Sequence, residues 1–161
     1  MNRAYLLTGG NIGNRLKELD NAAAFLKEEA GEIVALSGIY ETAAWGKTDQ
    51  PTFLNQCIAI ETALDASKLL TVIMGVEIKM GRHRQEKYGP RVIDIDILLY
   101  NDDIINHTSL TVPHPQLINR RFALTPLAEI APDVVHPVFK KTISELLREC
   151  NDALPVKKLQ N

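Results

Sequence analysis

Two aspartates in an apolar segment are the residues of this chain best suited to chemistry. Asp94 and Asp96 stand two positions apart inside a run rich in isoleucine. Alternate side chains of a strand share a face, so both carboxylates point the same way, roughly 7 Å apart at Cα. Two neighbouring carboxylates repel each other unless a cation compensates them, and oxygen ligands beside substrate phosphates suit Mg²⁺. The residues expected on the opposite, core-facing side are Ile93, Ile95, Ile97 and Leu99.

Basic residues lead directly into this acidic pair. Arg91 stands three residues before Asp94 and is suited to a phosphate. Residues 79–91 hold six basic side chains and one acidic one. A run of this kind is either a solvated loop or a set of charges that closes over a triphosphate and excludes water. For the aspartates themselves, the alternative is an acidic sheet face without function, although strands disfavour aspartate.

Two further side chains have a structural and a functional interpretation. Glu77 borders the apolar stripe of the helix expected over 65–81, where an ion pair at the helix edge is favoured over a supporting role in a site. His114 lies between two prolines, which fix the direction of its ring. Most single histidines are structural, but Asn-Arg-Arg follows at 119–121. These residues together predict a phosphate-facing cluster.

Aromatic and amide side chains suggest a place for a flat ring. Trp45 and Tyr88 fall in expected loops, where they could flank a ring by stacking. Asn55 alternates with Phe53 on one strand face, and its amide offers both a donor and an acceptor to the edge of a heterocycle. The glycine-rich segment 9–13 has neither the spacing nor the lysine of a phosphate-binding loop. We interpret it as a strand-to-helix turn.

Size and composition restrict the class of protein. The chain has 161 residues, 45% of them hydrophobic, which predicts a single domain over residues 1–161. Its net charge of −2 argues against a surface built for nucleic acid or for an anionic membrane. The two cysteines lack metal-ligand spacing, and neither a signal peptide nor a membrane-spanning run is evident. We therefore expect a reduced, cytoplasmic protein, as a monomer.

The elements that must position these residues follow from periodicity. The expected strands and helices, in chain order, are strand 4–8, helix 14–31, strands 33–42 and 53–62, helix 65–81 and strand 92–100. A return strand at 104–105 and a last helix from Thr142 follow. The order β-α-β-β-α-β predicts an α+β, ferredoxin-like (split βαβ) sandwich. We expect a mostly antiparallel sheet with helices on one face, and an extra C-terminal hairpin and helices.

Residues 87–98 closely resemble the signature of the 6-hydroxymethyl-7,8-dihydropterin pyrophosphokinase family of folate biosynthesis. The resemblance extends over nearly the whole chain. The further matching segments are Gly10-Asn11, Tyr40-Glu41-Thr42, Gln50-Pro51, Phe53-Leu54-Asn55, Glu77 with Gly81-Arg82, Thr111-Val112-Pro113-His114, and Asn119-Arg120 with Phe122. A signature of this length is specific.

The resemblance implies transfer of the β,γ-pyrophosphate of ATP to the hydroxymethyl group of the pterin, with release of AMP. It implies that Asp94 and Asp96 bind two Mg²⁺ ions, and that Arg82 and Arg91 hold the phosphates and stabilise the transferring group. The other nucleotide-side positions that it implies are Glu77, Arg84, Ile97, Thr111, His114 and Arg120. The implied pterin pocket consists of Thr42, Phe53, Asn55 and Phe122, to which the two loop aromatics, Trp45 and Tyr88, are added.

The chain departs from the family pattern at several positions. Tyr88 stands where many members have tryptophan, and Phe53 stands where some have tyrosine. Pro115 replaces a tyrosine of some members, and Ser109 replaces a basic residue. These changes affect loop closure and the choice of stacking partner rather than the reaction.

Two other functions are compatible with parts of the pattern. A two-metal phosphohydrolase or nuclease would use the same carboxylates to activate water. A non-catalytic binding module is the second alternative, because split βαβ domains also bind RNA or small regulators. Binding of RNA fits poorly with the net charge of −2 and with carboxylates on the face where stacking aromatics would be expected.

The role assigned to Arg82 can be tested by kinetics. If its guanidinium stabilises the transferring group, Arg82→Ala slows the chemical step more than it weakens ATP binding. Single-turnover rates at saturating ATP, compared with the ATP dissociation constant, measure the two effects separately. A variant in which only the Michaelis constant for ATP rises would show that Arg82 merely docks the substrate.

Overall fold

A computed structural model describes residues 1–44, 49–81 and 90–160 of the chain. The predicted site residues Trp45, Arg82, Arg84 and Tyr88 lie outside these ranges. The elements, in order, are β1 (Asn2–Gly10), α1 (Arg15–Glu29), β2 (Glu32–Leu36), β3 (Tyr40–Thr42), β4 (Phe53–Thr62), α2 (Ala66–Lys79), β5 (Asp94–Tyr100), β6 (Ile105–Asn106), β7 (Thr111–Val112), a 3₁₀ turn (Leu117–Asn119), α3 (Arg121–Ile130), α4 (Ile143–Glu149) and β8 (Val156–Lys158).

The main sheet has the strand order β5-β1-β4-β3-β8, and β2 also pairs with β4. All of these pairings are antiparallel. The predicted α+β, split βαβ arrangement is therefore confirmed. The single strand expected over 33–42 is instead divided into β2 and β3, which pair with two successive stretches of β4. The division occurs where the Ser37 side chain accepts a hydrogen bond from the Cys57 backbone, 2.9 Å away.

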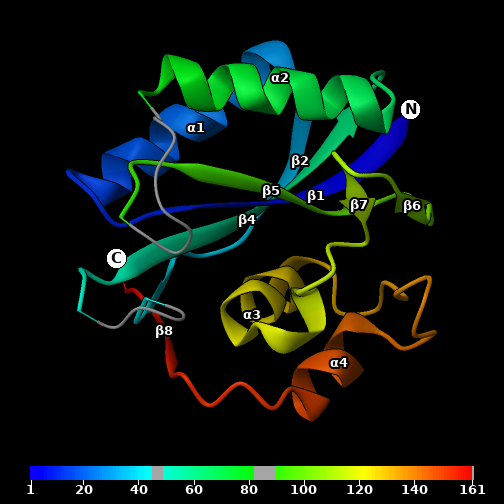
Figure 1. Ribbon diagram of the computed structural model, residues 1–161. Coiled ribbons are helices and arrows are strands. Elements are labelled where there is room, and N and C mark those ends of the chain that lie inside the picture. The colour runs from blue at the N-terminus through cyan, green and yellow to red at the C-terminus, as the bar shows by residue number, and fades with distance from the viewer. Residues whose placement is uncertain (45–48, 82–89, 161) are drawn as a thin grey trace.

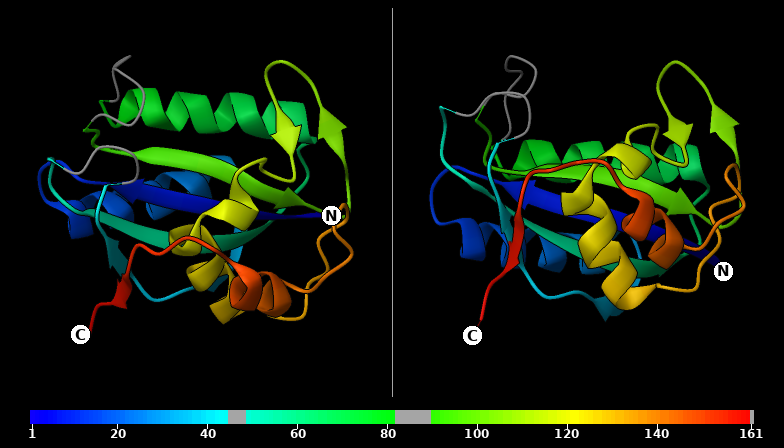
Figure 2. Two further views of the ribbon diagram at one scale, coloured as in Figure 1. Left: turned by 60° about the horizontal axis from the view of Figure 1, so that its bottom comes forward. Right: turned by 90° about the horizontal axis from the view of Figure 1, so that it is seen from below.

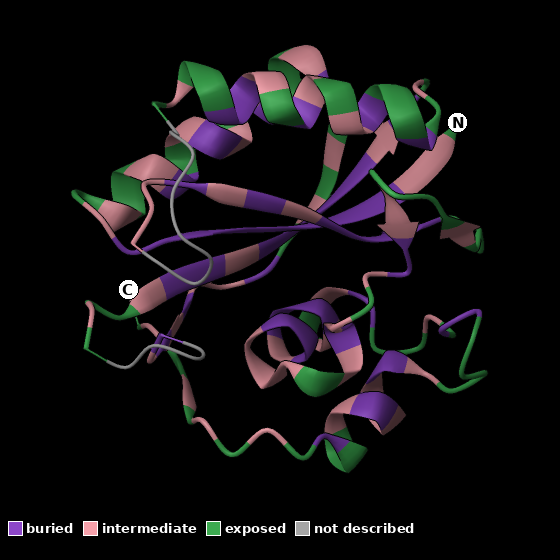
Figure 3. Ribbon diagram, in the orientation of Figure 1, coloured by how far each residue is buried: buried purple, intermediate pink, exposed green. Residues whose placement is uncertain are grey.

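Helices cover the two faces of the sheet unequally (Figures 1 and 2). Helices α1 and α2 lie across one face, as expected for the split βαβ unit, and α3 and α4 lie on the other. Each face has its own apolar core, and the buried positions follow the strands through the centre of the molecule (Figure 3). The C-terminal helices occupy only part of their face, which leaves the end of the sheet nearest Asp94 for a site.

The helices begin where the sequence predicts. Asn14 caps α1 and Asp65 caps α2, each by accepting a backbone hydrogen bond from the first turn. At α4, Thr142 and Glu145 form the predicted capping box, in which each side chain binds the backbone of the other residue. In the part of the chain that the structure describes, the helices are too short or too polar to cross a bilayer.

The edge strand β5 contains a β-bulge, which corrects the prediction for Leu99. Its pairing with β1 passes from Leu6↔Ile97 to Tyr5↔Leu99, so Leu98 is an extra residue. An extra residue reverses the alternation of faces. As a result Leu99 joins the core under α3 instead of the core that holds Ile97. The return strand expected at 104–105 is β6, and it pairs with β7 rather than with β5.

His136 organises the loop between α3 and α4. Its side chain is 2% exposed, and its Nδ1 accepts hydrogen bonds from the backbone N–H groups of Val138 and Phe139, at 3.2 and 3.3 Å. Burial lowers the pKa of His136 below its ordinary value of 6.5. Protonation would both remove the acceptor and place a charge in the interior.

The pH dependence of stability should reflect His136. The unfolded chain takes up this proton near pH 6.5, whereas the folded ring takes it up only at lower pH. The contribution of the neutral His136 ring to the free energy of unfolding is therefore complete above pH 6.5. It is lost as the pH falls toward the lower pKa of the folded state. In His136→Asn, the amide oxygen replaces Nδ1 as acceptor without titrating, so urea unfolding should depend less steeply on pH between 7 and 5. A slope equal to that of the wild type would contradict this assignment.

Candidate functional site

The aspartate pair lies on β5, at one edge of the main sheet, with both side chains on the face that α3 partly covers. Across the strands, Asp94 is opposite Gly9 and Asp96 is opposite Leu7, a residue of the core under α3. Both aspartates are partly exposed. The guanidinium of Arg91 donates to the Asp94 carboxylate at 3.1 Å. The structure thus confirms that the two acids share a face and that Arg91 lies beside them.

One row of residues crosses three strand pairings and connects the acids to the other side of the site. Gly9 is opposite both Asp94 and Asn55, and Asn55 is opposite Tyr40. Directly opposite residues of an antiparallel pair lie on the same face. A Cβ at position 9 would lie 2.0 Å from Nδ2 of Asn55. Only glycine leaves room there for the amide, which donates to the Thr8 carbonyl at 3.3 Å.

Glu77 supports the aspartate strand from α2. Its side chain is 7% exposed, and its carboxylate accepts a hydrogen bond of 2.8 Å from the backbone N–H of Ile95, the residue between the two aspartates. This bond satisfies an N–H group on the outer edge of β5. The supporting role, which was the less favoured of the two interpretations from sequence, therefore has a direct structural basis.

The Leu98 bulge helps to place His114. The backbone N–H of His114 donates to the Leu98 carbonyl at 2.9 Å, which holds the segment after β7 against the edge of β5. The His114 Nδ1 accepts from the Gln116 N–H at 3.1 Å. Burial, reinforced by the charge of Arg120 and opposed by that of Asp94, lowers the pKa of His114 to about 4. At neutral pH the ring is uncharged, and Nε2 carries the remaining proton as a donor.

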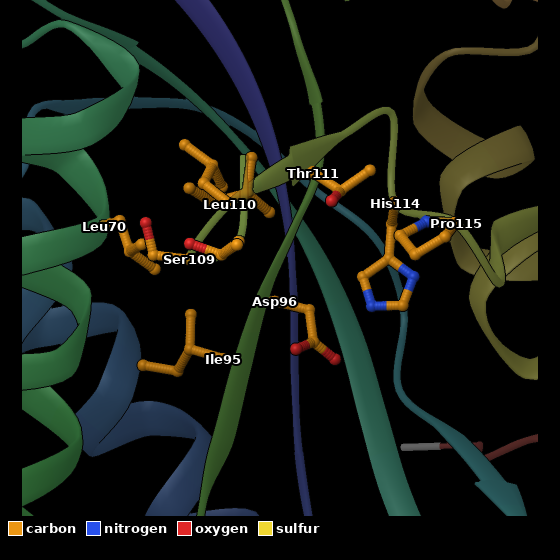
Figure 4. A pocket seen from close by; sticks show the side chains of 10 residues that line it. Leu70, Ile95, Asp96, Ser109, Leu110, Thr111, His114 and Pro115 are labelled. Atoms are coloured by element: carbon orange, nitrogen blue, oxygen red, sulfur yellow. The ribbon is translucent and has the colours of Figure 1, made fainter. Parts of the chain in front are cut away.

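A pocket lies along the outer edge of β5. Its volume is about 260 Å³, and its walls combine apolar side chains with hydroxyl groups from the turn between β6 and β7. The lining residues are Leu70, Ile95, Asp96, Ile97, Thr108, Ser109, Leu110, Thr111, His114 and Pro115. Figure 4 shows Asp96 and His114 on one side of β5, and Ile95, Leu70 and Ser109 on the other. The predicted residues Ile97, Thr111 and His114 are therefore brought together with Asp96.

Two members of the phosphate-facing cluster predicted around residues 119–121 bond to other parts of the chain. Arg121 bonds to the C-terminal segment, with its guanidinium 2.9 Å from the Cys150 carbonyl and 3.0 Å from that of Asp152. The amide of Asn119 donates to the Gln116 side chain at 3.1 Å. These side chains stabilise local turns, since their donors find closer partners there.

A second group of predicted residues lies on the same face, at β3, β4 and the start of α3. Thr42 and Phe53 are opposite each other, two pairs further along than Asn55 and Tyr40. The hydroxyl of Thr42 is buried and has no hydrogen-bond partner among the residues that the structure describes. Arg120 caps α3, and its guanidinium lies 5.7 Å from the ring centroid of Phe122. Because a buried hydroxyl normally finds a partner, the Thr42 hydroxyl is a candidate for a hydrogen bond to a ligand.

Asn11 joins two segments that surround the site, a role that was not predicted from sequence. Its side chain is 3% exposed and donates to the Gln50 side chain at 2.8 Å and to the Pro51 carbonyl at 2.9 Å. Its carbonyl oxygen accepts from the Arg91 N–H at 2.9 Å, and its own N–H donates to the Arg91 carbonyl at 3.0 Å. One buried amide therefore fixes Arg91 relative to residues 50 and 51.

Arg15 holds Thr52, the residue that follows the segment bound by Asn11. This role too was not predicted from sequence. Its guanidinium donates to the Glu41 carboxylate at 3.1 Å and to the hydroxyl and carbonyl of Thr52 at 2.8 and 3.0 Å. The hydrogen bond from Thr52, followed by that from Arg15, lowers the pKa of Glu41. Arg15 thereby holds the end of β3 close to the start of β4, which are the segments before and after residues 43–52.

The chain matches the family model described as 7,8-dihydro-6-hydroxymethylpterin-pyrophosphokinase (HPPK) over residues 5–132. All the predicted site residues fall within this range. Among relatives named 2-amino-4-hydroxy-6-hydroxymethyldihydropteridine pyrophosphokinase, that of Aquifex aeolicus is 44% identical over 149 residues, which is 92% of each chain. That of Methylorubrum extorquens is 44% identical over 148 residues, covering 91% of this chain and 92% of its own.

Solved structures agree on the fold. A crystal structure of Plasmodium falciparum HPPK-DHPS with SDX-DHP has a TM-score of 0.75 at 19% identity, over 92% of this chain and 43% of that one. A structure of HPPK-DHPS in complex with substrates has a TM-score of 0.74 at 18% identity, again over 92% and 43%. This chain therefore spans less than half of those longer chains, and the likeness concerns the fold.

The connection made by Asn11 predicts an energetic coupling. Asn11→Ala removes three part-buried side-chain hydrogen bonds and should lower the free energy of unfolding by about 2–4 kcal/mol. In a double-mutant cycle with Gln50→Ala, urea unfolding should give a coupling of about 1 kcal/mol, since the first substitution already removes the bond that the second would break. Strictly additive effects would mean that the two side chains do not act together.

Proposed function

Since the chain belongs to the HPPK family, whose members are pyrophosphokinases of folate biosynthesis, we propose how its residues carry out the reaction. The protein transfers a pyrophosphoryl group to the hydroxymethyl group of 6-hydroxymethyl-7,8-dihydropterin. In the proposal, ATP is the donor: the hydroxymethyl oxygen attacks the β-phosphorus, the bond between the α- and β-phosphates breaks, and AMP leaves. Residues 1–161 act as one domain.

The pocket along β5 receives the nucleotide. Leu70 and Ile97 provide apolar walls for the base, and Thr111 contributes a hydroxyl at the turn that closes the pocket. Because Ile95 directs its N–H to the outer edge of β5, Ile97, two residues on, directs its backbone polar groups to the same edge. Those groups are suited to the hydrogen-bonding edge of adenine. Glu77 acts indirectly, by holding the strand.

The phosphates extend from this pocket toward the aspartates. His114, uncharged and with Nε2–H as a donor, lies on the same side of β5 as Asp96 and donates to a phosphate oxygen. The guanidinium groups of Arg120 and Arg91 supply positive charge for the phosphates. From the sequence resemblance, Arg82 and Arg84 complete the set, and they belong to the part of the chain outside the described residues.

The two carboxylates fit Mg²⁺. They share a face and remain partly exposed, and no third His, Cys, Asp or Glu joins them in a metal-binding group among the described residues. A cation held by Asp94 and Asp96 therefore takes its other ligands from phosphates and water, which is the usual environment of Mg²⁺. Two such ions, when bound, neutralise the charge that develops on the phosphates.

The pterin occupies the second side of the site. Its ring stacks between Phe53 and Phe122, its polar edge faces the Asn55 amide, and the orphaned hydroxyl of Thr42 gains a partner. Trp45 and Tyr88 are proposed from sequence as additional loop aromatics. This arrangement excludes water from a reaction in which water would otherwise accept the pyrophosphate.

The observation that carries the proposal is the row Asp94, Gly9, Asn55. Two strand spacings separate the acid from the amide, about 10 Å between Cα atoms. A bicyclic ring held at Asn55 therefore directs a one-carbon substituent toward the aspartates and the bound phosphates. A two-metal hydrolase has no need of such an amide and aromatic pair, so the transferase is favoured.

A cytoplasmic monomer without a nucleic-acid partner stays a prediction from the sequence. Among the described residues, no helix has both the length and the apolar character needed to cross a membrane. The small-molecule substrates alone account for the site described here, because the pocket, the carboxylates and the aromatic pair each match one part of ATP or of the pterin.

The aspartates should be essential for transfer. Asp94→Asn and Asp96→Asn keep the shape of the side chain but remove its charge, and each should lower kcat by roughly a thousandfold, equivalent to about 4 kcal/mol. Formation of AMP and pterin pyrophosphate at saturating Mg²⁺ measures the loss. Asp103→Asn, on the exposed turn after β5, is the matched control and should retain full activity.

Either aspartate variant with a near-normal rate would contradict the assignment. Release of phosphate from ATP at the same rate with and without the pterin would instead favour a hydrolase.

A further inference from the structure

Tyr40 is a buried tyrosine next to the pterin side of the site. It is 7% exposed, lies opposite Asn55, and shares a face with Thr42 because the two stand two positions apart on β3. It therefore belongs to the row of opposite residues that carries Asp94 and Asn55.

The hydroxyl of Tyr40 is bound by a carboxylate from the opposite layer. It donates a short hydrogen bond to Glu129, in the last turn of α3. Nζ of Lys158 lies 3.4 Å from the same carboxylate oxygen, Oε1, and the other oxygen, Oε2, accepts from the Gly38 N–H at 3.0 Å. Lys158 is opposite Tyr40 on β8, the strand at the sheet edge beyond β3 (Figure 2). One carboxylate thus connects α3, β3 and β8.

The charges of this group are fixed at neutral pH. Burial, together with the hydrogen bond to Glu129 and its negative charge, raises the pKa of Tyr40 to about 12. Burial by itself raises the pKa of Glu129, but the bonds from Tyr40 and Gly38 and the charge of Lys158 outweigh it, so the net pKa is lowered. The phenol therefore remains a donor and the carboxylate an acceptor, which gives a charge-assisted bond.

Helix α3 carries Glu129 at one end and Phe122 at the other. Its ten residues span about 15 Å, with Pro126 in the interior of the helix. The Phe122 end is tied to the C-terminal segment by Arg121, and the Glu129 end is tied to β3 by Tyr40. The position of Phe122 above the sheet therefore depends on both ties.

Building on the pterin side assigned under the proposed function, we infer that Tyr40 and Glu129 are positioning residues that set the gap between the sheet and Phe122, into which the pterin ring enters. A ring stacked between two aromatic side chains requires a defined separation. Neither residue touches the reacting atoms. Their effect is expected on pterin binding, with ATP binding at the opposite edge of the sheet left unchanged.

The test compares two buried tyrosines in the same sheet. Tyr40→Phe removes the hydroxyl that binds Glu129. Tyr100→Phe removes a hydroxyl that is equally hidden, on a side chain 3% exposed, and that donates to the Leu64 carbonyl at 2.5 Å under the other face. Each substitution removes one part-buried hydrogen bond, so thermal unfolding of both variants is measured beside their substrate binding. They should differ in substrate binding.

We expect Tyr40→Phe to raise the Michaelis constant for the pterin about tenfold, with kcat and the Michaelis constant for ATP little changed. Tyr100→Phe should leave both constants at their wild-type values. Glu129→Gln keeps an acceptor for the phenol and should restore pterin binding relative to Glu129→Ala. It also serves as the independent test if Tyr40→Phe does not fold.

Three results would overturn the inference. They are a Tyr40→Phe variant with unchanged pterin binding, a Tyr100→Phe variant with the same rise, and Glu129→Gln and Glu129→Ala variants that both bind pterin like the wild type. Asn55→Ala and Phe122→Ala distinguish this failure from that of the site. If they weaken pterin binding and Tyr40→Phe does not, only the positioning role is wrong, whereas if they have no effect, the pterin side itself is misplaced.

Discussion

The register of β1 between β5 and β4 is the constraint on which the site depends. It places a carboxylate and an amide on either side of Gly9, on one face of the sheet. Antiparallel hydrogen bonds fix this register, and a shift of one residue would turn both groups to the opposite face. The missing side chain at position 9 is as important as the groups beside it, because any Cβ there would displace the Asn55 amide. In the proposed function, the sheet itself thus aligns the two substrates.

Several site residues also stabilise the edge strand that carries the aspartates. An exposed edge presents unpaired backbone groups, which proteins usually cover. On β5, Glu77 takes the Ile95 N–H, and the Leu98 carbonyl takes the His114 N–H. The same bonds that complete the edge therefore hold His114 beside β5 and stiffen the strand between the acids. Stability and function are coupled here, so substitutions at Glu77 need a measurement of folding beside one of activity.

The sequence was sufficient for the features that depend on local pattern. Alternation placed Asp94 and Asp96 on one face, and the caps at Asn14 and Asp65 marked where two helices begin. It failed where one residue changes the geometry: the bulge at Leu98 moves Leu99 to the other core, and nothing in a run of aliphatic residues marks its position. The contacts of Tyr40 with Glu129 span 89 residues, and those of Asn11 span up to 80. Such pairings depend on the packing of layers, which periodicity does not specify.

The most direct test of the central claim is a crystal structure with Mg²⁺, a non-hydrolysable ATP analogue and the pterin. The account predicts that Asp94 and Asp96 both contact Mg²⁺ at about 2.1 Å, with the phosphates beside them and the pterin edge at Asn55. A complex in which the two carboxylates bind only basic side chains, with the nucleotide away from β5, would contradict it.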